Sequence, residues 1–321
     1  MNTSTFFAPV HAGLDEVETL LQRQAQDAHP DLQAAVDHLL ASGGKRIRPA
    51  LGLLTGQMLG GPHDKLVTLA AAVELLHTAT LVHDDLIDGA LLRRGMPTLN
   101  ARWSPAATVL TGDFMFARAS KLATEAETLP LMRLFADTLA VIVNGELTQL
   151  FNARGVISRE NYTRRIYAKT ASLFEMSTRA AAMISPVDAD TIEAMRQYGY
   201  HLGMAFQIMD DILDFTGDEG AVGKPVGSDL LQGLVTLPAI YYAEKHPGDP
   251  DVVCLTGGCY SEQERMSRLI QSIRASDAVE SSKKEALGLI DRALSILESM
   301  PECEERKSLE LLARYTVSRT L

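Results

Sequence analysis

Hydrophobic residues recur along most of the chain at intervals of three and four residues, the period of an α-helix that buries one face. Strict alternation of apolar and polar residues, which is typical of a half-buried strand, is rare. The pattern therefore predicts an all-α protein. The predicted helices cover residues 13–28, 31–42, 49–59, 64–89, 104–125, 128–152, 158–184, 188–215, 236–245, 261–299 and 303–316.

The breaks between these helices indicate how the chain is organised. A Gly-Gly-Pro sequence at 60–62 is a clear break, and the five glycines within 217–233 predict the longest loop. No Ser/Pro-rich linker divides the chain. We therefore expect one helical domain over residues 1–321, with the region from about residue 245 onward as a candidate peripheral C-terminal lobe.

Two acidic motifs of the form Asp-Asp-x-x-Asp, at 84–88 and 210–214, end two of the long apolar helices. The helical period places the first and last aspartates of each motif on one face. Two carboxylates about 6 Å apart repel by roughly 3 kcal/mol at an effective dielectric near 20. The helix macrodipole also disfavours negative charge at a C-terminus. A bound divalent cation removes both penalties, and carboxylate oxygens suit Mg²⁺.

The alternative interpretation of each motif is a solvated acidic helix end. Apolar residues flank both motifs, for example Leu86 in the first and Ile212 in the second, and a solvated face lacks such neighbours. The second copy also weakens this alternative. The candidate metal ligands are therefore Asp84, Asp85, Asp88, Asp210, Asp211 and Asp214.

Basic residues near these motifs are candidates for binding phosphate groups. The segment 43–49 brings three cations into a Gly-rich entry to a helix, where backbone N–H groups and cations act together on an anion. Its spacing is not that of a P-loop. Each of the others, taken singly, has the character of a surface charge or a packed polar residue. They are Arg93, Arg94, Lys169, Thr170, Gln207 and Lys224.

Composition excludes several classes of protein. Hydrophobic residues make up 46% of the 321 residues and charged residues 22%, so the chain is neither disordered nor a disulfide scaffold. A net charge of −11 argues against nucleic-acid binding driven by bulk charge. An anionic ligand therefore needs a local basic cluster or metal ions.

Cysteine usage and the N-terminal segment suggest where the protein works. Three cysteines, an odd number without the spacing of a metal site, argue against a disulfide framework and a zinc site and favour a reducing, cytoplasmic compartment. Residues 1–13 lack Lys and Arg, unlike a signal peptide. No segment approaches about 20 uninterrupted apolar residues, so we expect no stable membrane insertion.

The motifs together resemble the trans-type isoprenyl diphosphate synthases, also called polyprenyl synthetases. The resemblance runs in unbroken order from about residue 40 to 240. Its specificity lies in the combination of two acidic motifs with the basic set. The matching segments are 43–49, 81–88, 92–95, Gly112-Asp113, 145–149, Lys169-Thr170, 206–214 and 223–238.

This resemblance implies an all-α fold of the isoprenoid synthase type, a single helical bundle with a deep central pocket, usually as a homodimer. It implies Mg²⁺-dependent head-to-tail (1'-4) condensation of isopentenyl diphosphate with an allylic diphosphate such as farnesyl diphosphate. About three Mg²⁺ ions per active site would bridge the six aspartates and the allylic diphosphate. By the same resemblance, Arg93, Lys169, Thr170, Gln207 and Lys224 contact the allylic diphosphate, and Lys45, Arg48, His77 and Arg94 bind isopentenyl diphosphate.

The implied chemistry explains these residue types. Breaking an allylic C–O bond leaves a carbocation and a diphosphate, so cations are needed where negative charge develops. The carbocation needs a dry apolar pocket that excludes water. His77 lies seven residues before Asp84, on nearly the same helix face; without the resemblance we would interpret it as a packed core residue. No side chain is an obvious base, so the released diphosphate is the expected proton acceptor.

Product length is expected to depend on the residues before the first acidic motif. In the family, large aromatic residues four and five positions before the first aspartate close the pocket, whereas this chain has Thr80 and Ala79. Both are small, which predicts a hexaprenyl (C30) or longer product, as used for quinone side chains. The alternatives are that both residues merely pack against another helix and that the product is farnesyl or geranylgeranyl diphosphate.

Leu234 departs from the family pattern, because many relatives have Lys at this position. A terpene cyclase is disfavoured, since its second metal motif normally contains Asn, Ser/Thr and Glu rather than the Asp residues at 210–214. A non-catalytic subunit of a heterodimeric synthase is the main alternative that is not an enzyme. Such subunits usually lose the acidic motifs, and both are complete here.

Overall fold

The computed structural model describes residues 6–26, 28–41, 43–93, 95–152, 155–217, 226–259 and 261–319. The chain divides into two compact units, each built from segments that are distant in sequence. Unit 1 comprises Met1–Asp137, Met176–Arg196 and Met300–Leu309. Unit 2 comprises Thr138–Glu175, Gln197–Ser299 and Glu310–Leu321. The single domain expected over residues 1–321 stays a prediction.

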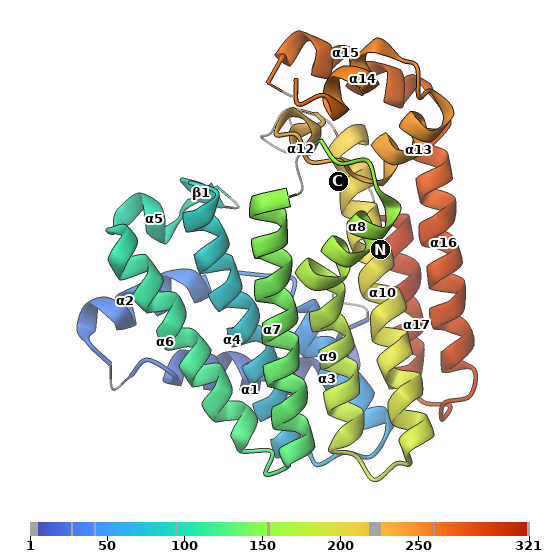
Figure 1. Ribbon diagram of the computed structural model, residues 1–321. Coiled ribbons are helices and arrows are strands. Elements are labelled where there is room, and N and C mark those ends of the chain that lie inside the picture. Colours follow the sequence, from blue (N-terminus) through green and yellow to red (C-terminus); the bar gives the residue numbers. More distant parts are fainter. Residues whose placement is uncertain are drawn as a thin grey trace. The chain divides into compact units, whose positions relative to one another are not determined.

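Helix α4 (His63–Ile87) is the centre of unit 1, where it packs against α1 (His11–Arg23), α3 (Ile47–Met58) and α6 (Pro105–Thr124) (Figure 1). Alone among the described helices, α4 has the length and mean hydropathy (1.5) for a membrane span, but 67% of its most apolar window is buried in protein. The other elements of this unit are η1 (Ala8–Val10), α1 (His11–Arg23), α2 (Pro30–Ala41), α3 (Ile47–Met58), β1 (Leu92–Arg93), β2 (Met96–Pro97), α5 (Leu99–Arg102) and α6 (Pro105–Thr124).

A glycine allows α4 and α6 to approach closely. A Cβ atom at Gly112 of α6 would collide with the ring of His83 on α4. That ring lies 3.1 Å from the carbonyl oxygen of Val109 and 3.6 Å from the Asp113 carboxylate. The Gly-Asp pair noted in the sequence is therefore a packing feature beside the first acidic motif.

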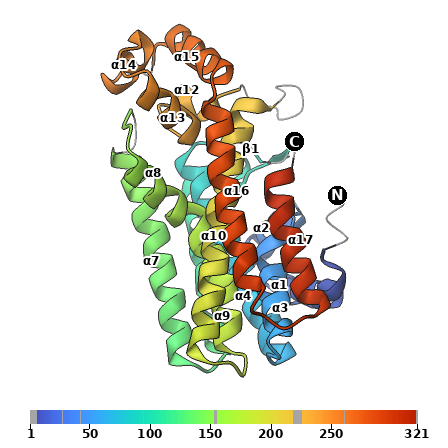
Figure 2. The same cartoon turned by 90° about the vertical axis from the view of Figure 1, so that its right-hand side faces the viewer.

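Unit 2 has its C-terminal helices around α16 (Ala278–Leu297). Helix α13 (Leu237–Lys245) packs against α16 and α15 (Gln263–Ala275), and α14 (Pro250–Thr256) packs against α15. The three shorter helices therefore gather at one end of α16 (Figure 2). The elements after α6 are α7 (Leu129–Asn152), α8 (Arg159–Ile166), η2 (Tyr167–Ala171), α9 (Ser172–Met183), α10 (Ala189–Thr216), α12 (Ser228–Leu231), α13 (Leu237–Lys245), α14 (Pro250–Thr256), α15 (Gln263–Ala275), α16 and α17 (Glu304–Ser318). Helices α7, α9, α10 and α17 each contribute residues to both units.

The all-α prediction is confirmed, with corrections to individual elements. The helix predicted over 261–299 is wrong, because it is two helices separated at Ser276. Ser276 has extended backbone, and its hydroxyl accepts a hydrogen bond from the Ala278 N–H, which starts α16. The loop predicted over 217–233 contains α12. The short elements α5, α14 and the β1–β2 hairpin were not predicted.

The helix predicted over 158–184 contains a π-helical turn, η2, between α8 and α9. Such a turn widens the hydrogen-bond spacing by one residue, and turns of this kind are frequent at functional sites. The buried hydroxyl of Ser172 donates to the carbonyl oxygen of Ala168 at 2.9 Å, so this carbonyl group has a partner. The turn carries Lys169 and Thr170, two of the predicted site residues.

Candidate active site

The first acidic motif ends α4 in unit 1, and its middle aspartate is buried against an arginine. Asp85 is 6% exposed. Nε of Arg93, on β1, lies 2.9 and 3.0 Å from the two oxygens of Asp85, and Nη2 lies 2.7 Å from Oδ1. Burial lowers the pKa of Arg93, but the hydrogen bond and the charges of Asp85, Asp84 and Asp88 outweigh it and raise the pKa. The hairpin therefore presents a permanently charged guanidinium beside the motif.

The outer aspartates of this motif are less buried than Asp85. Asp84 is half-buried and Asp88 is exposed, and the Asp88 N–H donates to the Asp84 carbonyl oxygen at 2.8 Å. His77 and Thr80 are half-buried, and the Thr80 hydroxyl donates to the His77 carbonyl oxygen. By helical spacing, these four residues share one face of α4.

Ala79 belongs to a different face of the same helix. It is fully buried, and it lies four residues before His83, which contacts α6. This placement favours helix packing as the role of Ala79. Thr80, in contrast, lies on the face of Asp84, four residues away, so it is the better of the two candidates for influencing product length.

The Gly-rich segment before α3 separates its three cations. Arg46 adopts a left-handed conformation (φ 48°), and its guanidinium contacts Glu18 at 2.5 Å and the buried Glu74 at 2.7 Å. These ion pairs hold a backbone conformation that is costly for a non-glycine residue. Lys45 is exposed and Arg48 is half-buried in the first turn of α3. Arg46 is thus held by ion pairs within the protein, which is consistent with the assignment of only Lys45 and Arg48 to substrate.

The second acidic motif ends α10 in unit 2, and its middle aspartate is again buried. Asp211 is 4% exposed and accepts hydrogen bonds from the Tyr162 hydroxyl at 2.7 Å and the Gln207 amide at 2.8 Å. Burial, with repulsion from Asp229, raises the pKa of Asp211 to about 7. Asp214 caps the short helix α12: it accepts from the N–H and hydroxyl of Ser228.

Thr170 and Gln207, two of the predicted site residues, are in contact, and Lys169 precedes Thr170 on the π-helical turn. The Thr170 hydroxyl donates to the Gln207 side-chain oxygen at 2.5 Å, and Gln207 in turn donates to Asp211. The Lys169 ammonium lies 3.3 Å from the Glu146 carboxylate on α7. This hydrogen-bonded chain aligns the π-helical turn with the second acidic motif.

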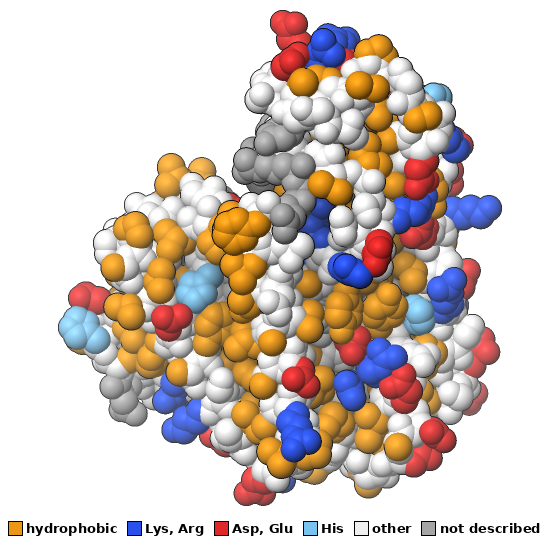
Figure 3. All heavy atoms as spheres, viewed as in Figure 1, with side chains coloured by type: hydrophobic (Ala, Val, Ile, Leu, Met, Phe, Trp, Pro, Cys, Tyr) orange, Lys and Arg blue, Asp and Glu red, His pale blue; other side chains and the backbone are white. Residues whose placement is uncertain are grey.

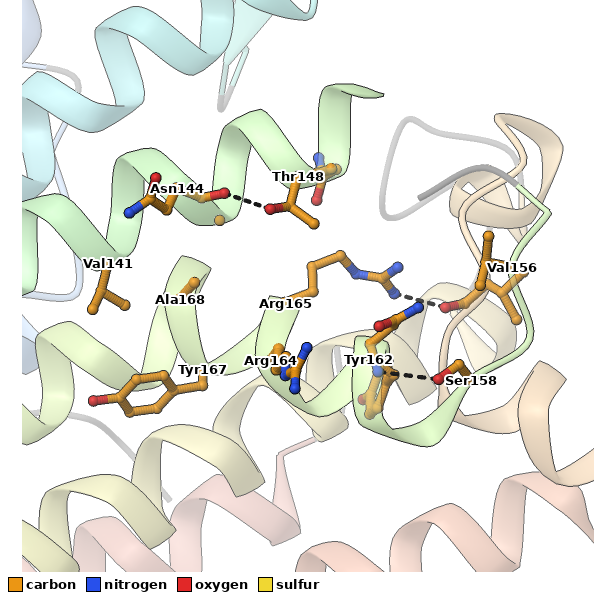
Figure 4. A pocket seen from close by; sticks show the side chains of 14 residues that line it. Val141, Asn144, Thr148, Val156, Ser158, Tyr162, Arg164, Arg165, Tyr167 and Ala168 are labelled. Carbon is orange, nitrogen blue, oxygen red and sulfur yellow. Dashed lines mark hydrogen bonds between the residues drawn. The ribbon is translucent and has the colours of Figure 1, made fainter. Parts of the chain in front are cut away.

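A cavity of about 580 Å³ opens between α7 and α8 in unit 2 (Figure 4). Arg165 projects into it; Nη2 of Arg165 donates to the Val235 carbonyl oxygen at 2.6 Å. Tyr162 forms part of the wall and links it to Asp211. A Cβ atom at Gly145 of α7 would collide with Ala168, so this glycine is needed for the close approach of α7 to η2.

Several functional contacts were not predicted from the sequence. Tyr162 and Arg319, which contact Asp211 and Asp210, belong to none of the motifs that the sequence analysis singled out. The predicted residues Arg94 and Lys224 lie outside the described residues. Leu234 is half-buried, and its N–H donates to the Asp229 carbonyl oxygen at 2.9 Å.

The three cysteines are free, which agrees with the expected absence of a disulfide framework. The structure also places possible metal-ligand atoms of Cys254, Cys259 and Glu262 within 4.8 Å of one another, a grouping that the spacing did not predict. Arg265 donates to the Glu262 carboxylate at 2.8 Å, and burial raises the pKa of the Cys254 thiol. Both features oppose cation binding at this group.

Comparison with known proteins places these features in a family. The family model described as polyprenyl synthetase matches residues 29–273. Heptaprenyl diphosphate synthase component 2 of Bacillus subtilis (strain 168) is 37% identical over 307 residues, 95% of this chain and 88% of that protein. Octaprenyl diphosphate synthase of Escherichia coli (strain K12) is 34% identical over 286 residues, 88% of each chain.

A solved structure supports the same placement. The crystal structure of a polyprenyl synthase from Caulobacter crescentus CB15, complexed with calcium and isoprenyl diphosphate, matches with a TM-score of 0.91 at 35% identity. The match covers 99% of this chain and 98% of that one. These findings confirm the resemblance drawn from the motifs. The chain belongs to the polyprenyl synthetase family, the trans-prenyl diphosphate synthases, and has their all-α isoprenoid synthase fold.

Proposed function

We propose that this protein is a prenyltransferase that condenses isopentenyl diphosphate head-to-tail with an allylic diphosphate, such as farnesyl diphosphate, to make a medium- or long-chain trans-polyprenyl diphosphate. One observation carries the proposal. Each acidic motif buries its middle aspartate against protein donors, Arg93 for Asp85 and Tyr162 with Gln207 for Asp211. The first aspartate of each motif, Asp84 or Asp210, is only half-buried.

The donor chemistry of these motifs fits a hard divalent cation. Asp84 and Asp88 place two carboxylates on one helical turn, where their mutual repulsion is relieved by a cation. The Caulobacter crescentus relative was crystallised with calcium and isoprenyl diphosphate. Mg²⁺, about three ions by the family resemblance, would be held by Asp84 and Asp88 in the first motif and by Asp210 in the second, and would neutralise the departing diphosphate.

The chain's own residues supply the remaining contacts. Arg93 stays charged because Asp85 holds it, so it is a fixed donor to diphosphate oxygens. Lys169 presents an ammonium on the π-helical turn, and the Thr170 hydroxyl, by donating to Gln207, ties that turn to the Gln207–Asp211–Tyr162 chain. Such fixed donors stabilise charge that develops on the leaving group without reorganising.

A product assay tests this function. The purified chain, incubated with Mg²⁺, farnesyl diphosphate and labelled isopentenyl diphosphate, is expected to give a ladder of prenyl products that ends at hexaprenyl or longer. Relatives named heptaprenyl and octaprenyl diphosphate synthases support this length, and quinone side chains are the proposed use. No product, with EDTA making no difference, would contradict the proposal.

Thr80 offers a sharper test of product length. Replacing Thr80 with Phe puts a ring on the Asp84 face of α4, so the ladder is expected to shorten toward farnesyl or geranylgeranyl diphosphate. Thr68, half-buried on the same helix three turns earlier, is the matched control position. An unchanged ladder in Thr80→Phe, with wild-type turnover, would assign product length to other residues.

Self-association is supported by an apolar stripe on α7 in unit 2. The stripe consists of four exposed apolar residues that follow the helical period: Val143, Leu147, Leu150 and Phe151. Phe151 is 74% exposed. Figure 3 shows hydrophobic side chains at the surface over α7. Contiguous exposed apolar residues are typical of protein interfaces, and we propose a homodimer. A heterodimer is the alternative, because the Bacillus subtilis relative is named as a component.

A charged residue introduced into this apolar stripe is expected to disrupt self-association. Leu147→Glu is expected to convert a dimer into a monomer in light scattering coupled to gel filtration, because a carboxylate is costly to bury without a partner. Leu287, an exposed leucine on α16, provides the control variant Leu287→Glu. A monomeric wild-type chain that needs a second, different protein for activity would support the heterodimer instead.

The remaining proposals concern location and other partners. We propose that the enzyme works in the cytoplasm, since its three cysteines are free. No stable membrane insertion is proposed, because most of the apolar window of α4 is buried within the protein. We propose no nucleic-acid partner, because a net charge of −11 disfavours binding to a phosphate backbone.

A further inference from the structure

The C-terminal end of the chain brings an arginine to the second acidic motif. Arg319 directly follows α17, and its N–H continues the helix by donating to the Tyr315 carbonyl oxygen at 3.0 Å. Its Nη2 atom lies 2.8 Å from Oδ1 of Asp210. The side chain of Arg319 is 6% exposed and that of Asp210 is 42% exposed. A buried cation therefore meets a carboxylate that stays partly exposed.

Three further contacts fix this guanidinium. Nη2 donates to the Phe206 carbonyl oxygen at 2.6 Å, and Nε donates to the Thr316 carbonyl oxygen at 3.2 Å. The Cζ atom lies 3.9 Å from the centre of the Phe206 ring. Phe206 is one helical turn before Asp210 on α10. The guanidinium is thus anchored to the same helix that carries the aspartate, and its planar fork is held in one orientation.

We propose that Arg319 is a positioning residue that orients Asp210 toward the divalent cation and diphosphate of the reaction. The inference rests on the proposed function. Arg319 contacts Oδ1 of Asp210 from the protein side, while the carboxylate stays accessible from solvent. Groups that hydrogen-bond a metal ligand fix its direction, and their loss typically costs about 10–100-fold in metal affinity.

The alternative role for Arg319 is competition with the cation, because both attract the carboxylate of Asp210. If Arg319 merely neutralised Asp210, removing it would tighten cation binding. The geometry favours positioning, since the guanidinium already has the Phe206 and Thr316 carbonyl oxygens and the Phe206 ring as partners and need not move when a cation approaches. The two roles therefore predict changes of opposite sign.

Mn²⁺ binding to the full-length chain distinguishes them without requiring turnover. Free Mn²⁺ is measured by electron paramagnetic resonance in a background carrying Asp84→Asn and Asp88→Asn, which leaves the second motif intact. Arg319→Met keeps an apolar stem on Phe206 but removes the charge, and it is expected to weaken Mn²⁺ binding by about 10–100-fold. Arg314→Met, an exposed arginine on the same helix, is the control and should bind Mn²⁺ like its parent.

Arg319→Lys keeps the charge without the fork and is expected to lose less affinity than Arg319→Met. It also keeps the test decisive if Arg319→Met does not fold, as judged by its melting curve. Unchanged or tighter Mn²⁺ binding in the folded Arg319 variants would overturn the inference.

Kinetics in the otherwise wild-type chain provide a second readout. Arg319→Met should need more Mg²⁺ for half-maximal rate and recover at saturating Mg²⁺, whereas a merely structural lesion lowers the rate at every Mg²⁺ concentration. The outcomes for Arg319 and for the proposed function stay separable. Altered Mn²⁺ binding without any prenyl product would overturn the proposed function alone. A normal product ladder with unaltered Mn²⁺ binding would overturn the role of Arg319 alone.

Discussion

Replacing Asp84 with Ala is expected to lower kcat by about 10³-fold or more, because it removes a charge aimed at the site where negative charge develops. Folding should be preserved. Asp84 is half-buried at the end of α4 and repels Asp88 one turn away, so its loss relieves repulsion at a helix C-terminus. The measurement is steady-state turnover of farnesyl and isopentenyl diphosphate, with far-UV circular dichroism and a melting curve on the same preparation.

Asp291 provides the matched control for this prediction. It is an exposed aspartate on α16, away from both acidic motifs in sequence. Asp291→Ala should keep wild-type turnover. If Asp84→Ala kept turnover within tenfold of wild type, or unfolded the protein, the assignment of Asp84 to the cation site would be wrong.

Replacing Arg93 with Met is expected to impair both stability and activity. It leaves Asp85 buried without its guanidinium, and removing one partner of a buried ion pair costs about 3–5 kcal/mol. The Arg93 side chain is 38% exposed, so we expect the lower end, about 3 kcal/mol, in urea unfolding followed by circular dichroism. The lost donor to diphosphate should also lower kcat/KM by about 10²-fold.

A double variant separates these two effects of Arg93. In Asp85→Leu with Arg93→Met, both charges are gone, and replacing a buried pair by apolar groups of similar size is often neutral for stability. We therefore expect most of the free energy of unfolding to return while kcat/KM stays low. Recovery of activity together with stability would show that Arg93 acts only as a structural partner of Asp85.

The sequence predicted the long helices because their apolar faces follow one period over many residues. It failed where short-range chemistry overrides that period. At Ser276 a hydroxyl cap splits a predicted helix into two. In η2 one extra residue shifts the apolar pattern by a single position, and periodicity alone does not detect so small a change within one turn.

The site residues divide in the same way. Lys169, Thr170 and Gln207 were predicted as one group through the family motifs, and in the structure a hydrogen bond joins Thr170 and Gln207. The Asp-Asp-x-x-Asp pattern did not show that the aspartates of each motif differ in burial. Asp85 and Asp211 are buried and hydrogen-bonded to protein donors, whereas Asp84 and Asp210 are half-buried. Arg319 was missed because its partner lies 109 residues earlier, and no local pattern encodes a contact at that separation.

The π-helical turn at Tyr167–Ala171 holds one residue more than an ordinary α-helical turn. Deleting one residue there would restore ordinary helical winding, and α8 and α9 would keep their helical register because the wider turn already absorbs the extra residue. Tyr162 would still face Asp211, but Lys169 and Thr170 would shift relative to it. A one-residue gap placed here in an alignment of relatives therefore marks a change in how this turn presents its site residues, and not a neutral loop change.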